Sequence, residues 1–347
     1  MALVGIIANP AASKDIRRLV AQGRVVPDWE KVNTLRRVLV GLQAVGIERV
    51  VGMPDASNLC RRSRDDAQVS LELELLDMQV YHEEGDTARA ATMMREMGVD
   101  CLVTLGGDGT NRAAATGSGQ IPIVAISTGT NNVFPTMVEG TLAGLAAGLV
   151  AQGKLDLSRI STVSKTLNVY IDGRYREMAL IDVAFSQERF VAARAIWDLS
   201  TLYEVFLTRA EPTSIGLAAV GAALQPVTLA EEGGLHYVLD SSPGDEQPGA
   251  SGPQPVSEPV TVLAAIAPGL VQKVPIPRWR RLVLGERIAV ERRYATVALD
   301  GERAFSVNPE QLVEVELRRS GPPVVAVDAA LKEAAQLGLF RFGKFRG

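Results

Sequence analysis

A glycine-rich segment in the first half of the chain combines residues suited to phosphoryl transfer. It reads Gly106-Gly107-Asp108-Gly109-Thr110, follows the apolar run Cys101–Leu105 and precedes the helix-compatible run Asn111–Ala115. Glycines let the backbone approach a phosphate closely, and the N–H groups and dipole at a helix N-terminus favour its negative charge. We therefore predict a phosphate-binding set consisting of Gly106, Gly107, Gly109, Thr110 and Asn111.

Asp108 is unusual in such a loop because a carboxylate repels phosphate. Its presence is explained if it binds Mg²⁺ or accepts a proton from an attacking hydroxyl group, and phosphoryl transfer needs both functions. We predict Asp108 as a catalytic residue and as a Mg²⁺ ligand. The alternative is that Asp108 and Thr110 only form a tight turn and cap a helix.

Two further polar segments follow apolar runs. Thr128, Gly129, Thr130, Asn131 and Asn132 come after Ile121–Ile126, and their hydroxyl and amide groups suit a ribose, base or phosphate. Adjacent parallel strands place their loops at the same carboxyl edge, where such sheets bind ligands. Asp300-Gly301-Glu302 ends a later apolar run. A capped turn and a hairpin turn are the respective alternatives.

Other nucleotide-binding motifs are excluded. Gly148–Leu155 and Gly338–Phe345 have the glycine and lysine spacing of a P-loop but lack its Ser or Thr. Gly107-Asp108-Gly109 lacks the third glycine of a dinucleotide fingerprint, so a hydride-transfer dehydrogenase is not supported.

Short apolar runs alternate with helical patterns in the first third of the chain. This alternation predicts a parallel sheet covered by helices. The predicted strands are Leu3–Ala8, Ile47–Gly52, Leu75–Tyr81, Cys101–Leu105 and Ile121–Ile126.

The pattern becomes extended after Gly153 and predicts an antiparallel sandwich or distorted barrel. A helix from about Gln187, with Leu199, Leu202 and Phe206 on one face, interrupts it. The predicted extended segments are Lys165–Ile171, Tyr175–Phe185, Ile215–Val220, His236–Leu239, Val260–Ala267, Arg281–Leu284, Ala295–Leu299 and Leu312–Leu317.

These patterns predict three parts of the chain. We expect an α/β nucleotide-binding domain over residues 1–135 and a β-sandwich domain over residues 136–320. A proline-rich segment at 240–259, which contains almost nothing that could pack, is predicted to be a disordered loop. Residues 321–347 are expected to form a C-terminal helix that returns to the first domain.

Composition limits the partners. The 347 residues are 47% hydrophobic and carry a formal net charge of −4, without the basic excess that nucleic acid binding requires. No segment reaches the ~20 apolar residues of a membrane span, so we expect no stable membrane insertion. Two cysteines and two histidines favour a reducing, cytoplasmic compartment. We predict a small-molecule substrate, and a homo-oligomer stays open.

The motifs together resemble a known superfamily. Gly106–Thr110 is similar to the signature shared by NAD kinases, diacylglycerol and sphingosine kinases, and acetoin-catabolism X proteins. Ile7–Lys14, Ser127–Phe134 and Val297–Glu302 resemble, in the same order, its first loop, its second loop and its late strand end. The resemblance extends from Ile6 to about Val307 and is closest to the NAD-kinase-like acetoin-catabolism X branch.

The resemblance implies a fold and an activity. The fold is α/β, with an N-terminal parallel α/β sheet domain and a C-terminal antiparallel β-sandwich domain, as in NAD kinases and diacylglycerol kinases. The activity is an ATP- and Mg²⁺-dependent kinase with a hydroxyl acceptor, NAD or a related nucleotide, which would serve NADP biosynthesis. The implied catalytic residues are Asp108, Asp300 and Glu302, and Asn9 and Asp182 join the binding residues.

The sequence departs from NAD kinases at one position. They carry Asn-Glu at the end of a sandwich strand, and the matching residues here are Ile181 and Asp182. Asp182 is left to contact a sugar hydroxyl. A lipid or small-alcohol kinase and a non-catalytic nucleotide or dinucleotide sensor therefore stay open as alternatives.

Overall fold

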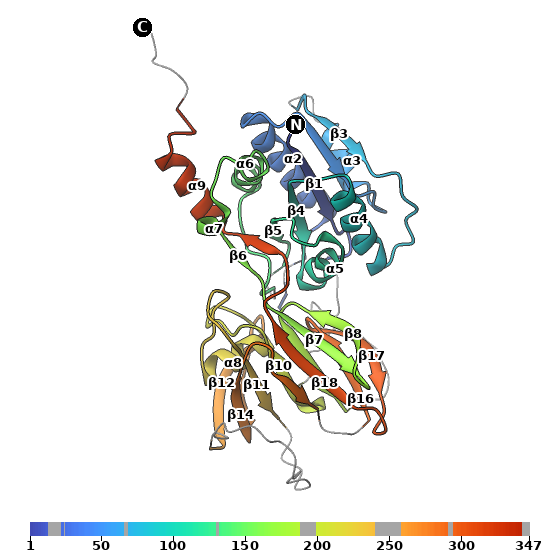
Figure 1. Ribbon diagram of the computed structural model, residues 1–347, viewed down its shortest axis with the longest axis vertical. Coiled ribbons are helices and arrows are strands. Elements are labelled where there is room, and N and C mark those ends of the chain that lie inside the picture. The colour runs from blue at the N-terminus through green and yellow to red at the C-terminus, as the bar shows by residue number, and fades with distance from the viewer. Residues whose placement is uncertain are drawn as a thin grey trace.

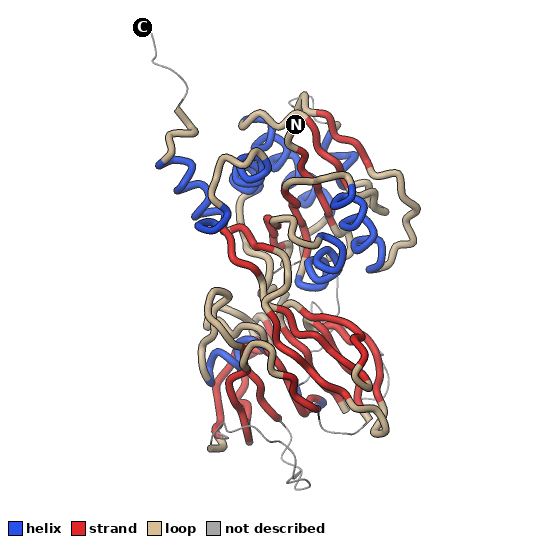
Figure 2. The backbone as a smooth tube through the Cα atoms, viewed as in Figure 1, coloured by secondary structure: helices blue, strands red, loops and turns tan. Residues whose placement is uncertain are grey.

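The computed structural model describes residues 1–12, 22–23, 25–65, 69–129, 132–187, 199–239, 258–290 and 294–341. The chain forms an α/β domain, which contains most of the helices, and a domain built mainly of strands (Figures 1 and 2). Strands β6 and β19 lie side by side where the chain passes between the two (Figure 1). The predicted fold class is confirmed.

The α/β domain is built on a seven-stranded sheet whose strand order reverses direction between β1 and β4. All neighbours are parallel except β19 and β6. In sheet order the strands are β3 (Glu72–Leu75), β2 (Arg49–Gly52), β1 (Leu3–Ala8), β4 (Cys101–Gly106), β5 (Ile123–Ser127), β19 (Pro323–Val325) and β6 (Ser161–Val163). Such a reversal opens a crevice at the carboxyl ends of the strands. Asn9 and the glycine loop lie at this point.

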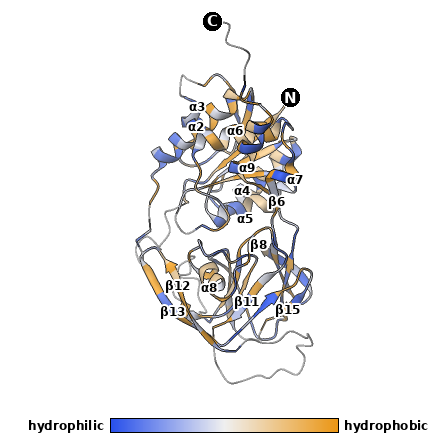
Figure 3. Ribbon diagram, turned by 90° about the vertical axis from the view of Figure 1, so that its left-hand side faces the viewer, coloured by the Kyte–Doolittle hydropathy of each residue, from blue (hydrophilic) through white to orange (hydrophobic). Residues whose placement is uncertain are grey.

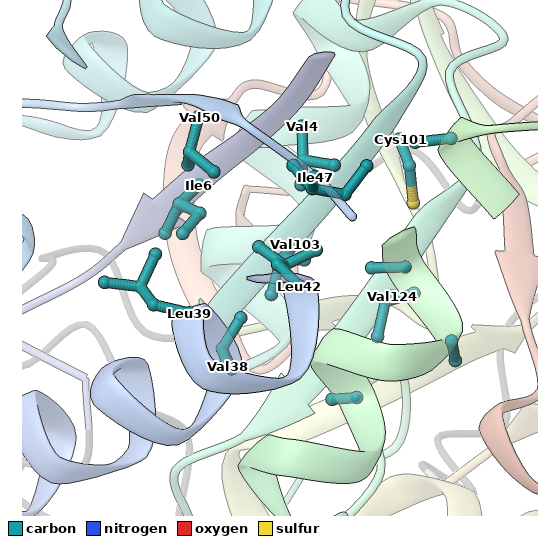
Figure 4. Packing of buried hydrophobic residues seen from close by; sticks show 14 of the residues in the cluster. Val4, Ile6, Val38, Leu39, Leu42, Ile47, Val50, Cys101, Val103 and Val124 are labelled. Atoms are coloured by element: carbon teal, nitrogen blue, oxygen red, sulfur yellow. The ribbon is translucent and has the colours of Figure 1, made fainter. Parts of the chain in front are cut away.

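Helices cover both faces of this sheet. One face carries α2 (Asp28–Ala44), α3 (Leu59–Arg64), α6 (Gly140–Ala151), α7 (Leu157–Ile160) and α9 (Val327–Gln336), and the other carries α4 (Glu84–Glu96) and α5 (Asp108–Ser118). Val38, Leu39 and Leu42 of α2 recur at helical spacing and pack against Val4 and Ile6 of β1 (Figure 4). The apolar stripe of α2 thus fixes the helix on the sheet.

Helices α2 and α6 pack in direct backbone contact. A Cβ atom added to Gly41 would lie 2.3 Å from the Thr141 carbonyl oxygen, and one added to Gly144 would lie 2.2 Å from the Val38 carbonyl oxygen. The glycine and alanine content of α6 therefore serves a close helix crossing.

The second domain is a β-sandwich of two antiparallel sheets. The larger sheet contains β14 (Arg278–Leu282), β11 (Gly234–Val238), β10 (Leu202–Leu207), β9 (Asp182–Ser186), β16 (Ala295–Leu299) and β17 (Glu302–Val307). The smaller contains β15 (Arg287–Ala289), β18 (Val313–Arg318), β7 (Thr166–Ile171) and β8 (Arg174–Ala179). Apolar side chains of both sheets form the core between them.

A third layer covers the outer face of the larger sheet. It consists of α8 (Leu217–Leu224) and a hairpin of β12 (Val260–Ala267) and β13 (Leu270–Ile276). The apolar helix α8 lies against β12 (Figure 3). Tyr237 of β11 donates its hydroxyl hydrogen to the Leu217 carbonyl and joins the layer to the sheet.

The structure places the domain boundaries differently from the sequence prediction. Residues 136–163, expected in the sandwich, contain α6 and β6, which pack on the first sheet. Residues 321–347 contribute β19 to the same sheet before α9 packs on α6 and α7. The chain crosses at residues 164 and 321, where the Ser164 and Gly321 backbones bond to one another. The boundaries were missed because β19 pairs with β6, which is distant in the sequence, and local sequence patterns do not predict such a contact.

Several predicted elements also differ. Ile215–Val220, expected as extended, leads into α8, and Leu202–Leu207, expected as helical, is β10. Both segments are almost entirely apolar, and such runs do not reveal their period. The predicted strand Leu75–Tyr81 is β3, which ends at Leu75. The rest of the helix predicted from about Gln187 and residues 240–257 of the predicted loop lie outside the described residues.

None of the helices in the described part of the chain has both the length and the apolar composition needed to cross a bilayer.

The α2–α6 contact gives a test of packing. Gly144→Ala should lower the free energy of unfolding by about 1–3 kcal/mol, because the new methyl group meets the Val38 carbonyl and the helices must separate. Gly85→Ala in α4 is the control, since its Cβ would meet only flexible side-chain ends at 3.3 Å. Urea unfolding measures both; equal effects would contradict the close crossing.

Candidate active site

The glycine loop joins the end of β4 to the start of α5. Gly107 precedes the helix, and Asp108 is its first residue. The Asn111 side chain is fully buried beneath the loop: its Oδ1 accepts a hydrogen bond from the Thr104 hydroxyl at 2.6 Å, and its Nδ2 donates to the Gly107 carbonyl at 2.8 Å. The structure thus places Asn111 where it fixes the loop from within.

Two glycines of the loop allow close approach by neighbouring side chains. A Cβ at Gly106 would lie 2.5 Å from the Thr110 hydroxyl oxygen, and one at Gly107 would lie 2.9 Å from Asn132 Oδ1. Both separations are shorter than van der Waals contact, so a larger residue would displace Thr110 or Asn132.

The loop after β1 lies beside the glycine loop. Asn9 Nδ2 donates to the Thr110 hydroxyl at 2.9 Å, and its Oδ1 accepts from the Ala11 N–H at 2.8 Å. The fully buried ammonium of Lys31 donates to the carbonyls of Asn9, Pro10 and Ala12 at 3.2, 2.7 and 2.9 Å. Lys31 therefore holds this loop from α2, and no sequence motif includes it.

Asp108 connects the glycine loop to the loop after β5. Its carboxylate accepts hydrogen bonds from the backbone N–H groups of Val133 and Phe134 at 2.8–3.0 Å. Asn132 Nδ2 donates to the Ser127 hydroxyl at 2.8 Å within the same loop. Thr128 is buried and precedes Gly129, while the predicted residues Thr130 and Asn131 lie outside the described residues.

The sandwich contributes the turn between β16 and β17. Asp300 and Gly301 both have positive φ, 52° and 75°. The Asp300 carboxylate is fully buried and accepts hydrogen bonds from the backbone N–H groups of residues 180–182, the shortest at 2.7 Å from Ile181. Gly301 N–H donates to Asp182 Oδ1 at 3.1 Å. Asp300 thus fixes the turn on the β8–β9 connection.

Glu302 reaches the glycine loop from this turn. A Cβ atom built on Gly109 would lie 3.4 Å from the Glu302 carboxyl carbon. Glu302, which is far from Asp108 and Gly109 in the sequence and in the other domain, therefore lies against the start of α5.

Two buried arginines, Arg112 and Arg209, were not predicted from the sequence. Arg112 on α5 pairs with Glu84 of α4 at 2.6 Å and lies 3.6 Å from Asp300 Oδ2. Burial raises the pKa of Asp300 to about 7, although Arg112 and the Ile181 N–H act to lower it.

Arg209 follows β10, and its guanidinium carbon lies 5.6 Å from the centre of the Phe134 ring. Its Nε and Nη2 are buried, and neither has a hydrogen-bond partner among the described residues. Burial lowers the pKa of Arg209, while the negative charges of Glu211, Asp108 and Asp300 act to raise it. The two nitrogens form one edge of the guanidinium, which matches a phosphate or a carboxylate.

A cavity of about 250 Å³ lies between α2 and the carboxyl ends of β4 and β5. Its polar lining includes Glu30, Thr34, Arg37 and Thr128, and the buried Thr128 hydroxyl has no hydrogen-bond partner among the described residues. Within those residues, no three His, Cys, Asp or Glu side chains cluster closely enough to hold a metal ion.

The raised pKa of Asp300 predicts a pH dependence. Its folded-state pKa of about 7 exceeds the ~3.9 of an unfolded aspartate, so the folded state binds more protons between these values. The free energy of unfolding should therefore fall as pH rises from about 4 to about 7, by at most on the order of 4 kcal/mol. Asp300→Asn should remove this slope. Urea unfolding across pH 4.5–8 measures it, and parallel curves for the two proteins would contradict the assignment.

Comparison with known proteins agrees with this architecture. Residues 4–154 match the profile of the ATP-NAD kinase N-terminal domain, and residues 165–320 match that of the acetoin catabolism protein X C-terminal domain. Acetoin catabolism protein X of Cupriavidus necator is 38% identical over 351 residues, which cover 98% of this chain and 94% of that protein.

The solved structures to which this chain is similar include two of a candidate diacylglycerol kinase from Bacillus anthracis str. Sterne. Both are 14% identical with a TM-score of 0.45 and cover 93% of this chain and 98% or 96% of theirs. This likeness carries no argument about function. The family match carries one, and it confirms the superfamily that the motifs indicated: the chain belongs to the acetoin catabolism protein X family, with an NAD kinase-like N-terminal domain.

Proposed function

We propose that the protein is a kinase that transfers a phosphoryl group from ATP to a hydroxyl group of NAD or a related nucleotide. The observation that carries the proposal is the meeting of Asp108, Gly109 and Glu302 at the start of α5. This arrangement supplies a helix N-terminus for phosphate and a carboxylate from the opposite domain.

The donor nucleotide fits the α/β domain. Its phosphates would bind the glycine loop, where the N–H groups and dipole of α5 favour negative charge. Its nucleoside would occupy the cavity of about 250 Å³, where Thr34, Arg37 and Thr128 offer hydrogen-bonding groups.

The site fits Mg²⁺ that arrives with the nucleotide. Mg²⁺ is usually bound by one or two carboxylates together with phosphate oxygens and water, and Asp108 borders the glycine loop. A resident metal would require a larger set of ligands than the described residues provide. When bound, the ion would neutralise phosphate charge.

The three acidic residues would have different roles. Asp108 binds the amides of the second loop and keeps the phosphate-binding loops together. The Asp300 side chain has no exposed surface, so it would act by fixing the turn. Glu302 lies against the glycine loop and would accept the proton of the acceptor hydroxyl, directly or through one water.

The acceptor is proposed to carry an anionic group. Arg209 supports this, because its buried edge of Nε and Nη2 suits a phosphate. An uncharged lipid alcohol has no anionic group to pair with it. NAD has such phosphates, and its phosphorylation yields NADP. Asp182, which is 8% exposed, would contact an acceptor hydroxyl.

The proposal is tested by incubating the protein with ATP and Mg²⁺ and one acceptor at a time, and measuring ADP release. NAD and NADH represent the proposed class, while diacylglycerol and short diols represent the lipid and small-alcohol alternatives. ADP release with NAD supports the proposal. Nucleotide binding without ADP release for any acceptor favours a sensor.

Conservative variants separate the roles of the carboxylates. Glu302→Gln should lower kcat by about 10²-fold with little change in the apparent affinity for ATP, because it removes a base and keeps the shape. Asp108→Asn should disturb both quantities, since Asp108 belongs to the loop that binds phosphate. Steady-state kinetics checks this; normal turnover by Glu302→Gln together with an inactive Asp108→Asn would move the base to Asp108.

Arg209→Met should raise KM for NAD by about tenfold or more, because the paired donors are lost. Its thermal unfolding midpoint should change little, since replacing a buried charge by an apolar side chain is often neutral. Arg209→Lys keeps the charge but cannot donate two parallel hydrogen bonds, so its KM for NAD should be intermediate. An unchanged KM in Arg209→Met would remove this residue from acceptor binding.

A further inference from the structure

We infer that Arg112 is a positioning residue: it bridges Glu84 and Asp300 across the domain boundary and holds the Asp300–Glu302 turn against the backbone of residues 180–182. The consequence for Glu302 as a base rests on the proposed function. The bridge itself does not, because it follows from contacts within the protein.

The bridge joins three elements. Arg112 lies on α5 one helical turn after Asp108, and only 5% of its surface is exposed. Its Nη2 lies 2.6 Å from Glu84 Oε1, which is at the start of α4 and partly exposed, and its Nε lies 3.6 Å from Asp300 Oδ2. Glu84 therefore orients a guanidinium whose Nε lies near the sandwich.

Asp300 needs this cation because its carboxylate is fully buried. Its buried carboxylate accepts the N–H groups of residues 180–182, and an ionised carboxyl group accepts all of them. A protonated carboxyl group would place its O–H donor beside these N–H donors, which disfavours the arrangement. Burying a charge without a partner is costly, and Arg112 is the partner that lies closest on the α/β side.

Other charges also face Asp300. Asp108 on α5 opposes its ionisation, whereas Arg209, which follows β10, favours it. Asp182 lies on the same connection and accepts the N–H of Gly301. Removing Arg112 leaves Asp300 facing Asp108 with Arg209 alone, so Asp300 would retain its proton to a higher pH.

The turn transmits the contact to the glycine loop. Asp300 and Glu302 are separated only by Gly301, and the Glu302 carboxyl group lies against Gly109. Arg112 thereby places Glu302 without touching a substrate. The ion pair also connects α5, which starts with Asp108, to the strand pair that carries Glu302.

The inference is tested first on the protein without nucleotide. Arg112→Met removes the charge at similar length, Arg112→Lys retains it, and Arg49→Met removes an exposed arginine that pairs with Glu72 and Glu74 far from this turn. Hydrogen exchange of the amides of residues 180–182 should rise by about tenfold or more in Arg112→Met and less in Arg112→Lys. Arg49→Met should leave it unchanged.

A second measurement is the pH dependence of unfolding. The fall in stability that ends near pH 7 in the unaltered protein should continue to higher pH in Arg112→Met, because Arg112 lowers the pKa of Asp300. If Arg112→Met fails to fold, Glu84→Gln tests the same bridge and should give smaller changes in the same direction.

Unchanged exchange at residues 180–182 together with an unchanged pH window would overturn the inference. Altered exchange in a protein that phosphorylates none of the acceptors would uphold the bridge and reject the proposed kinase. In an active enzyme, Arg112→Met should lower kcat while the KM for ATP stays the same.

Discussion

The site depends on carboxylates that bind the backbone amides of neighbouring loops. Loops without a ladder of strands must satisfy their N–H groups in another way. Asp108 does so for Val133 and Phe134, and Asp300 does so for residues 180–182. Each aspartate therefore defines the position of a second segment, and the loops around the candidate site are held by these two contacts.

An apolar cluster holds the two domains together. Leu180 and Ile181, which follow β8, are buried with Phe134 in an apolar cluster that extends from the α4 and α5 face of the first sheet into the sandwich. Asp108 and Asp300 bind the backbone on either side of this cluster. Apolar packing is not directional and hydrogen bonds are. The cluster therefore supplies adhesion between the domains, and each carboxylate fixes a segment of its own domain beside the cluster.

Local patterns predicted the strands that fill the core, and tertiary contacts decided the rest. β1, β12 and β16 lie at the predicted residues because each is a short apolar run bounded by polar or turn residues. Leu202–Leu207, predicted as helical, is a strand, and Ile215–Val220, predicted as extended, leads into the helix Leu217–Leu224. The period of such apolar runs is hidden when most of their side chains are buried. In the site, the glycine loop and the Asp300–Glu302 turn could be found because glycines and acids stand out in sequence. Lys31, Arg112 and Arg209 could not, because their roles come from partners at least 19 residues away in the chain.

The position that distinguishes this chain from NAD kinases is also explained by these contacts. Ile181 replaces the asparagine expected there, and its side chain is fully buried in the cluster between the domains. Its backbone N–H binds Asp300 at 2.7 Å. The residue thus serves the domain contact with both its side chain and its backbone, and neither is presented to a ligand. On the proposed function, acceptor recognition therefore falls to Asp182, Arg209 and the loop after β5. An acceptor that meets a carboxylate and a buried guanidinium must offer hydroxyl and anionic groups close together, as a nucleotide does and a diacylglycerol does not.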